Sequence, residues 1–270
     1  MSKKNSTFAP DLKYQQNMIL TIIAKILLAV VPGSLLLAYI YHKDPHKEPD
    51  SALTFAFLSG ILVAVLAVGI ELGIKYSLFG TGDYTTLLGA VLMAFLVAAL
   101  PEEGLKLIYL TKAVKHEKVK PHFDEHFDGI VYAVFVGMGF AIVENILYVL
   151  PEENWLMTGL ARAFLSVPAH YAFAIIMGYY FSLYHFVDHS RKNAFLMFFL
   201  PFLLHGCYDT LVMSVKINPT LGGIAFLVLI VFCVKMHQQA NRRIRNLIDL
   251  DRKKEQELNS LTSRSDILTI

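Results

Sequence analysis

Carboxylates and histidines recur inside long apolar stretches of this 270-residue chain. Residues 101–110 read PEEGLKLIYL, which places Glu102, Glu103 and Lys106 close together on any helix. Glu102 and Lys106 are four residues apart and can pair along one helix face. Glu103 lies about 100° away around the helix and is free to point elsewhere. A carboxylate held beside a lysine in apolar surroundings can serve as a general base toward water.

Three further apolar stretches carry polar side chains that suit the same chemistry. GFAIVEN contains Glu144, VPAHYAF contains His170, and LLHGCYD contains His205 and Asp209. The spacing of four puts His205 and Asp209 on one helix face, one turn apart. This pattern suits either a carboxylate that orients an imidazole or two ligands of one metal ion.

Each of these groups also has an ordinary structural explanation. The PEEGLK run could mark a helix end at the membrane interface, Glu144 could reach water, and the histidines could be hydrogen-bonded core residues. A charge at the centre of a bilayer, however, costs on the order of 3 kcal/mol. Because four successive stretches carry such groups, one shared polar site is the better interpretation. Lys25 and Glu71 lie nearer the ends of their apolar stretches and are weaker candidates for this site.

The elements that must position these residues are membrane-spanning helices. The chain is 55% hydrophobic, and its charges cluster between continuous apolar runs of about 20 residues, the length that crosses a bilayer as a helix. We expect an all-α, polytopic membrane helical bundle of about seven transmembrane helices. Residues 1–240 form its transmembrane domain and residues 241–270 a charged cytoplasmic tail. The expected spans are residues 18–41, 51–74, 85 to the basic loop at 112–120, 129–150, 159–186, 194–215 and 221–236.

Lysine and arginine predict the orientation of this bundle. The loops after the first, third and fifth spans and the C-terminal tail are basic, and the opposite loops are not. By the positive-inside rule, the N-terminus lies outside and the C-terminus in the cytoplasm of a plasma-membrane protein. The net charge of +2 gives no indication of a nucleic-acid partner.

The order of these motifs resembles the PrsW family of intramembrane proteases. That family is similar to the wider group of CAAX-prenyl-processing and bacteriocin-processing membrane proteases. The resemblance implies an endopeptidase whose partners are the lipid bilayer and a membrane-protein substrate such as an anti-sigma factor, cut on its extracytoplasmic side. It also implies that Glu102, Glu103 and His205 are essential. The residues that carry it are Glu102, Glu103, Lys106, Phe140, Glu144, His170, His205 and Asp209, with the acidic loop of Asp44, Pro45, Glu48 and Pro49.

Our hypothesis is hydrolysis of a peptide bond by water that Glu103 or Glu102 activates. Lys106 would neutralise one carboxylate, and Asp209 would orient His205. A divalent metal such as Zn²⁺ could take part, because zinc accepts carboxylate and imidazole ligands. A metal-free glutamate mechanism stays open, since the sequence has no HExxH helix. The candidate metal ligands are Glu103, Glu144, His170 and His205.

Two other functions compete with proteolysis. A proton-coupled transporter would use the same intramembrane carboxylates, but it predicts two symmetric halves with broken helices, and the sequence shows no such symmetry. A non-catalytic module could bind a membrane protein without cutting it. Such a module would tolerate Glu103→Gln, whereas a protease would lose cleavage.

Overall fold

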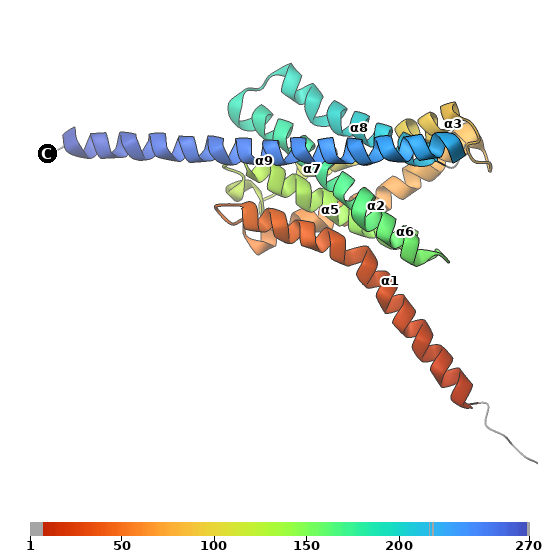
Figure 1. Cartoon of the computed structure of the whole chain (residues 1–270). Coiled ribbons are helices and arrows are strands. Elements are labelled where there is room, and N and C mark those ends of the chain that lie inside the picture. Colours follow the sequence, from red (N-terminus) through yellow and green to blue (C-terminus); the bar gives the residue numbers. More distant parts are fainter. Residues whose placement is uncertain (1–7, 216, 218, 269–270) are drawn as a thin grey trace, which may run out of the picture.

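The computed structural model describes residues 8–215, 217 and 219–268, and this part of the chain contains helices but no β-strand. Figure 1 shows how the helices are arranged. In chain order the elements are α1 (Phe8–Lys43), α2 (Asp50–Phe79), α3 (Leu87–Leu92), η1 (Met93–Ala99), α4 (Leu100–Ala113), η2 (Lys120–His122), α5 (Asp128–Val149), α6 (Trp155–Ala161), η3 (Arg162–Ser166), α7 (Val167–Ser182), η4 (Leu183–Val187), α8 (Arg191–Ser214) and α9 (Pro219–Leu268).

Seven helical stretches within the described residues are long and apolar enough to cross a membrane. The predicted all-α membrane bundle is therefore confirmed. The third of these stretches joins α3, η1 and α4, and the fifth runs from α6 to η4. Their bounds are Tyr14–Lys43, Asp50–Phe79, Leu87–Ala113, Asp128–Val149, Trp155–Val187, Arg191–Ser214 and Gly222–Thr262.

Two of the spans contain a π-helical segment just before a proline. The segment η1 precedes Pro101, and η3 precedes Pro168. A proline inside a helix lacks the N–H that would bond four residues back, and its ring crowds that carbonyl. A widened turn accommodates this conflict, and such turns often lie at functional sites. Both interruptions lie next to the polar residues singled out in the sequence.

The helix α5 lies at the centre of the bundle and packs against α1, α2 and α7. Glycines allow these close approaches. A Cβ built on Gly139 would lie 2.2 Å from the carbonyl oxygen of Phe57 on α2. A Cβ on Gly137 would lie 2.7 Å from the Cβ of Ala174 on α7. Because small residues let helix backbones meet, α5 is held firmly on two sides.

The last helix, α9, continues without a break past residue 241, where the sequence analysis placed the start of the tail. In Figure 1 it extends as a straight helix beyond the rest of the bundle, while the first half of α1 diverges from the other helices. Ile244 and Leu247 are 2% and 0% exposed, so the first turns of the tail pack on the bundle. The charged residues there share the helix with an apolar stripe.

Candidate functional site

The centre of the polar cluster is the first part of α4. The ammonium of Lys106 lies 3.1 Å from Oε2 of Glu102 and 2.8 Å from Oε1 of Glu103, and all three side chains are buried. The predicted pairing of Glu102 with Lys106 is confirmed. Glu103 does not point elsewhere, because residues three apart are also neighbours on a helix surface. One lysine therefore holds both carboxylates.

Helix α8 brings His205 against this pair. Its Nδ1 lies 2.9 Å from Oε1 of Glu103, and its Nε2 lies 3.3 Å from Oδ2 of Asp209. The ring of Phe173 stacks on the imidazole with 5.0 Å between the ring centroids. Both ring nitrogens thus face carboxylates, and the orientation of the imidazole is fixed from three sides.

Helices α5 and α7 add Glu144 and His170. Nε2 of His170 lies 2.8 Å from Oε2 of Glu144, and Nδ1 lies 3.4 Å from the ammonium of Lys106. Arg162 in η3 donates from Nη2 to the same oxygen of Glu144 over 2.7 Å and from Nε to Oδ1 of Asn145 over 2.6 Å. This series of contacts, from Arg162 through Glu144 to His170, thereby links η3, α5 and α7 to Lys106.

The sequence analysis gave no role to Arg162 or Asn145. Arg162 precedes His170 by eight residues in an apolar run, so its charge was a usable signal. Asn145, next to Glu144, offered no usable signal, since an uncharged amide is common in helices. Asn145 is fully buried and also donates to the carbonyl of Ala29 over 3.1 Å, which ties α1 to the site.

Part of this cluster has the composition of a metal site. Four residues can each offer one ligand atom such that all four atoms lie within 4.8 Å of one another: Glu102, Glu103, His170 and His205. Oε2 of Glu103 is buried and has no hydrogen-bond partner, which leaves one carboxylate oxygen available. Carboxylate oxygen and imidazole nitrogen are ligands that Zn²⁺ accepts. The residues therefore fit a divalent metal, and Glu144 contacts one of the four, His170, through its Nε2.

A cavity of about 580 Å³ lies beside the cluster. Its wall comes from α2, η1, α4, α5, η3 and α8, and from the loop after α2. The other members of the cluster lie behind this wall: Glu103, Lys106, His170 and His205 are each at most 5% exposed. The polar residues that line the cavity include Glu71, Glu102, Glu144, Arg162, Tyr208 and Asp209.

Of the predicted site residues, Glu102, Glu144 and Asp209 thus face the cavity, and the remaining ones support them from behind. Glu71, which carried little weight in the sequence analysis, also lines the cavity. Lys25 lies elsewhere. Its ammonium donates to the carbonyl oxygens of Leu150 and Glu152, at 2.8 and 2.9 Å, and so caps the end of α5.

A second buried polar cluster, the loop cluster, consists of Asp44, Glu48, Asp128 and Tyr132. The hydroxyl of Tyr132 donates to Glu48, and Oδ2 of Asp128 accepts from the backbone N–H groups of residues 124 and 125, at 2.9 and 2.7 Å. Burial raises the pKa of Asp44 to about 6 and the pKa of Glu48 to about 7. This cluster joins the loop between α1 and α2 to the start of α5.

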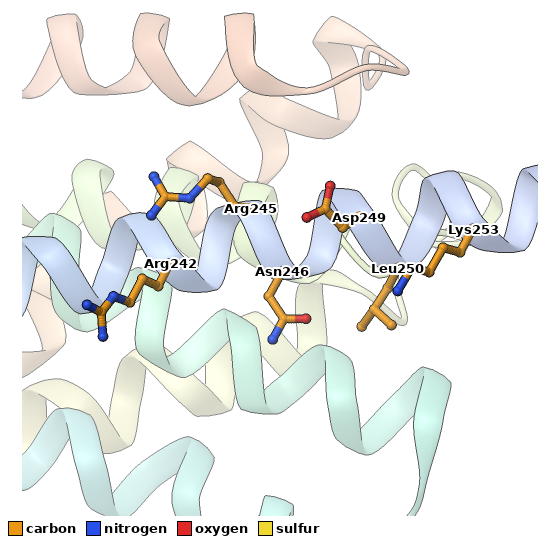
Figure 2. A pocket seen from close by; sticks show the side chains of 6 residues that line it. All are labelled: Arg242, Arg245, Asn246, Asp249, Leu250 and Lys253. Carbon is orange, nitrogen blue, oxygen red and sulfur yellow. The ribbon is translucent and has the colours of Figure 1, made fainter.

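A shallow pocket of about 310 Å³ lies on the C-terminal part of α9. Figure 2 shows that all six of its lining side chains extend from this one helix. They include three basic residues, Arg242, Arg245 and Lys253, together with Asp249. A pocket formed by one helix surface has no opposing wall, so it is a charged surface rather than an enclosed site.

Comparison with known proteins shows the family. Residues 48–236, more than half of the chain, match the PrsW family intramembrane metalloproteases. The chain is 39% identical to Protease PrsW of Clostridioides difficile over 194 residues, which cover 69% of this chain and 78% of the relative. It is 40% identical to Protease PrsW of Geobacillus kaustophilus over 188 residues, 68% of this chain and 78% of the relative.

A third relative, Protease PrsW of Bacillus subtilis, is 34% identical over 183 residues, 67% of this chain and 78% of that protein. No solved structure matches the chain. The matched region contains every residue of the polar cluster and ends before the charged part of α9. The chain therefore belongs to the PrsW family of intramembrane metalloproteases, and it is an integral multi-pass membrane protein that cleaves membrane-protein substrates.

Proposed function

We propose that this protease activates its water at Glu102, in the cavity between α2, α5 and α8. The observation that carries the assignment is the position of Glu102, which is the member of the Glu102–Glu103 pair that lines the cavity. A general base has to reach the water whose proton it takes. Glu102 would take that proton as the water oxygen attacks the carbonyl carbon of the substrate. It would then return the proton to the amine that leaves.

The other members of the cluster would hold this arrangement in place. Glu103 anchors Lys106 and His205 through one oxygen, at 2.8 and 2.9 Å. Asp209, whose Oδ2 lies 3.3 Å from Nε2 of His205, would fix the far side of this imidazole. Glu144 and Arg162 orient His170. Side chains whose positions are locked by such contacts keep catalytic groups within the narrow tolerance that catalysis requires.

Glu103, His170 and His205 would hold the metal that the family description implies, and we propose Zn²⁺ for it. A bound zinc ion polarises a carbonyl group and lowers the pKa of a water molecule. The metal content of the purified protein tests this assignment without an activity assay. We expect zinc in the wild type and its loss from His170→Ala and from His205→Ala. Equal zinc in a His185→Ala control, a histidine of η4 outside the cluster, would show that the loss is specific.

The position of the cavity supports a proposal for the side of cleavage. Its lining residues come from the C-terminal halves of α2, α5 and α8 and from Asp83 and Tyr84 in the loop after α2. By the positive-inside rule this end of the bundle is extracytoplasmic. The basic residues Arg242, Arg245 and Lys253 lie toward the opposite end, where Asp251 of α9 accepts from the backbone N–H groups of His126 and Phe127 at the start of α5. We therefore place the N-terminus outside the plasma membrane and the scissile bond in its outer half.

The substrate would be a membrane-anchored regulator such as an anti-sigma factor, cut on its extracytoplasmic side. The experiment compares the termini of membrane proteins in cells that express the wild type and Glu102→Gln at equal abundance. Glu153→Gln, a change of an exposed loop glutamate, is the matched control. New termini in the wild type and the control, and their absence in Glu102→Gln, are the expected result. Identical termini in all three strains would contradict the proposal.

A further inference from the structure

The helices α2 and α5 are in tight contact at one point and then separate. At the crossing, a Cβ on Gly60 of α2 would lie 2.0 Å from the carbonyl oxygen of Val136 on α5. A small apolar cluster of Val63, Ala64, Ala67 and Phe140 continues the contact for about two turns. Ala67 is the last buried residue of α2.

Beyond Ala67 the second half of α2 has few neighbours. None of the residues 68–79, all of them described, is buried. A Cβ on Gly69 or Gly73 would meet no atom within 4 Å. Leu147 and Tyr148 at the end of α5 are 51% and 54% exposed, and they line the cavity together with Leu72 of α2, which is 63% exposed. Apolar side chains therefore flank a gap that leads from the lipid into the site.

Contacts between neighbouring elements bridge other parts of the cavity wall. Helix α2 packs against η1, and η1 packs against α8. The hydroxyl groups of Ser166 in η3 and Tyr208 in α8 lie 3.0 Å apart. Arg162 in η3 is hydrogen-bonded to Glu144 in α5. The side between α2 and α5 is the one where the wall is held together only at the crossing.

The size of the cavity limits what can occupy it. A transmembrane helix of about 20 residues is about 30 Å long and about 10 Å across, far larger than a cavity of about 580 Å³ can enclose. The cavity therefore suits a short unwound segment. The remainder of a transmembrane substrate would have to stay in the lipid, next to the gap.

We propose that the gap between residues 68–79 of α2 and the end of α5 is the lateral entrance of the protease. The occupant is the transmembrane helix of a single-pass protein, which lies in the gap while its extracytoplasmic end unwinds into the cavity. This inference rests on the proposed function, because the same cavity receives the scissile bond. Exposed Leu72 and Leu147 favour a lipid-embedded partner, since a large apolar rim facing water would be costly.

A route from water is the alternative entrance. Asp83 and Tyr84 lie at the rim of the cavity in the loop after α2, and Asp83 is 3.9 Å from the ammonium of Lys75. A substrate that entered there would contact Tyr84 and not the middle of the gap. The two routes therefore predict different neighbours for the same substrate.

Site-specific photo-cross-linking separates these routes. The probe is the purified membrane protein in which the comparison of termini finds a new terminus. It is reconstituted in liposomes with the Glu102→Gln variant of the protease, which does not cleave it. A photo-reactive amino acid replaces Leu72, Leu147, Tyr84 or, as the control, Leu58. Leu58 is a lipid-exposed residue of α2 on the far side of the crossing, 55% exposed. The melting temperature of each variant in detergent, compared with that of Glu102→Gln alone, shows whether the variant folds.

We expect cross-links to the probe from positions 72 and 147 and none from position 58. Cross-links from position 84 alone would overturn the lateral entrance and leave the protease intact. Equal yields from positions 58 and 72 would also overturn it, because the contact would then be unspecific. A wild type that produces no new terminus would instead contradict the proposed function itself.

Discussion

Two buried polar clusters lie at opposite ends of α5, and they differ in what surrounds them. The proposed catalytic cluster at the C-terminal end draws on several spans, contains the cations Lys106 and Arg162, and forms part of a cavity wall. The loop cluster at the N-terminal end contains Asp44, Glu48 and Asp128, and none of these residues lines the 580 Å³ cavity.

The difference shows which feature distinguishes a site from a structural network. Both clusters bury carboxylates and both leave a carboxylate oxygen without a partner: Oε2 of Glu103 in one, and Oδ2 of Asp44 and Oδ1 of Asp128 in the other. Buried carboxylates therefore do not distinguish the two clusters. The members of the loop cluster do not line the 580 Å³ cavity, and its carboxylates are held by backbone N–H groups and by the hydroxyl of Tyr132. We infer that it fixes the loop between α1 and α2 to α5.

The sharpest test of this comparison is the same isosteric change in each cluster. Glu102→Gln removes the proposed general base and should lower the cleavage rate by at least about 100-fold. Asp128→Asn should leave the rate per folded molecule unchanged, because it is remote from the cavity. Rates of cleavage of the reconstituted substrate, normalised to folded protein, decide the matter. A comparable loss from Asp128→Asn would mean that both clusters belong to one catalytic unit.

Arg162 tests how far the catalytic cluster extends. We expect Arg162→Gln to lower kcat about 10- to 100-fold with little change in KM, because Glu144 would no longer hold His170 in one orientation. Arg162→Lys should recover part of the rate, since a lysine can still pair with Glu144. Steady-state kinetics of both variants give the answer. A rise in KM alone would instead assign Arg162 to substrate binding.

Much of this architecture was accessible from the sequence. The seven spans follow from apolar runs, and the convergence of His205 and Glu103 follows from the cost of isolated charges in lipid. The sequence could not show whether Glu102 or Glu103 is the better candidate for the general base. The two residues are adjacent, about 100° apart around the helix, so the rotation of α4 decides which carboxylate faces the cavity. It also did not reveal the packing of Ile244, because that apolar residue is surrounded by charge in the sequence.

The loop cluster should make folding stability depend on pH. Burial raises the pKa of Glu48 from 4.5 to about 7, so between these values the folded protein keeps a proton that the unfolded chain releases. Stability therefore falls as pH rises through this range. We expect the Tm in detergent to decrease by a few degrees from pH 5 to pH 7.5, and Glu48→Gln to flatten the slope. An unchanged slope in Glu48→Gln, with Glu153→Gln as reference, would assign the dependence to other groups.

A further effect on stability concerns the contact between the tail and the loop cluster's end of α5. Asp251 on α9 accepts hydrogen bonds from the backbone N–H groups of His126 and Phe127, at 2.8 and 2.9 Å. Asp251→Ala leaves these half-buried donors without a partner, which costs about 1–3 kcal/mol and lowers Tm by several degrees.

The matched control is Asp249→Ala, two residues earlier, whose side chain is 61% exposed and lies 3.7 Å from Arg252. An exposed pair of this kind contributes less than about 1 kcal/mol, so its loss should barely move Tm. Cleavage should persist in both variants, since neither residue touches the cavity. Equal melting temperatures would show that the hydrogen bonds to Asp251 add nothing measurable to the stability of the protein.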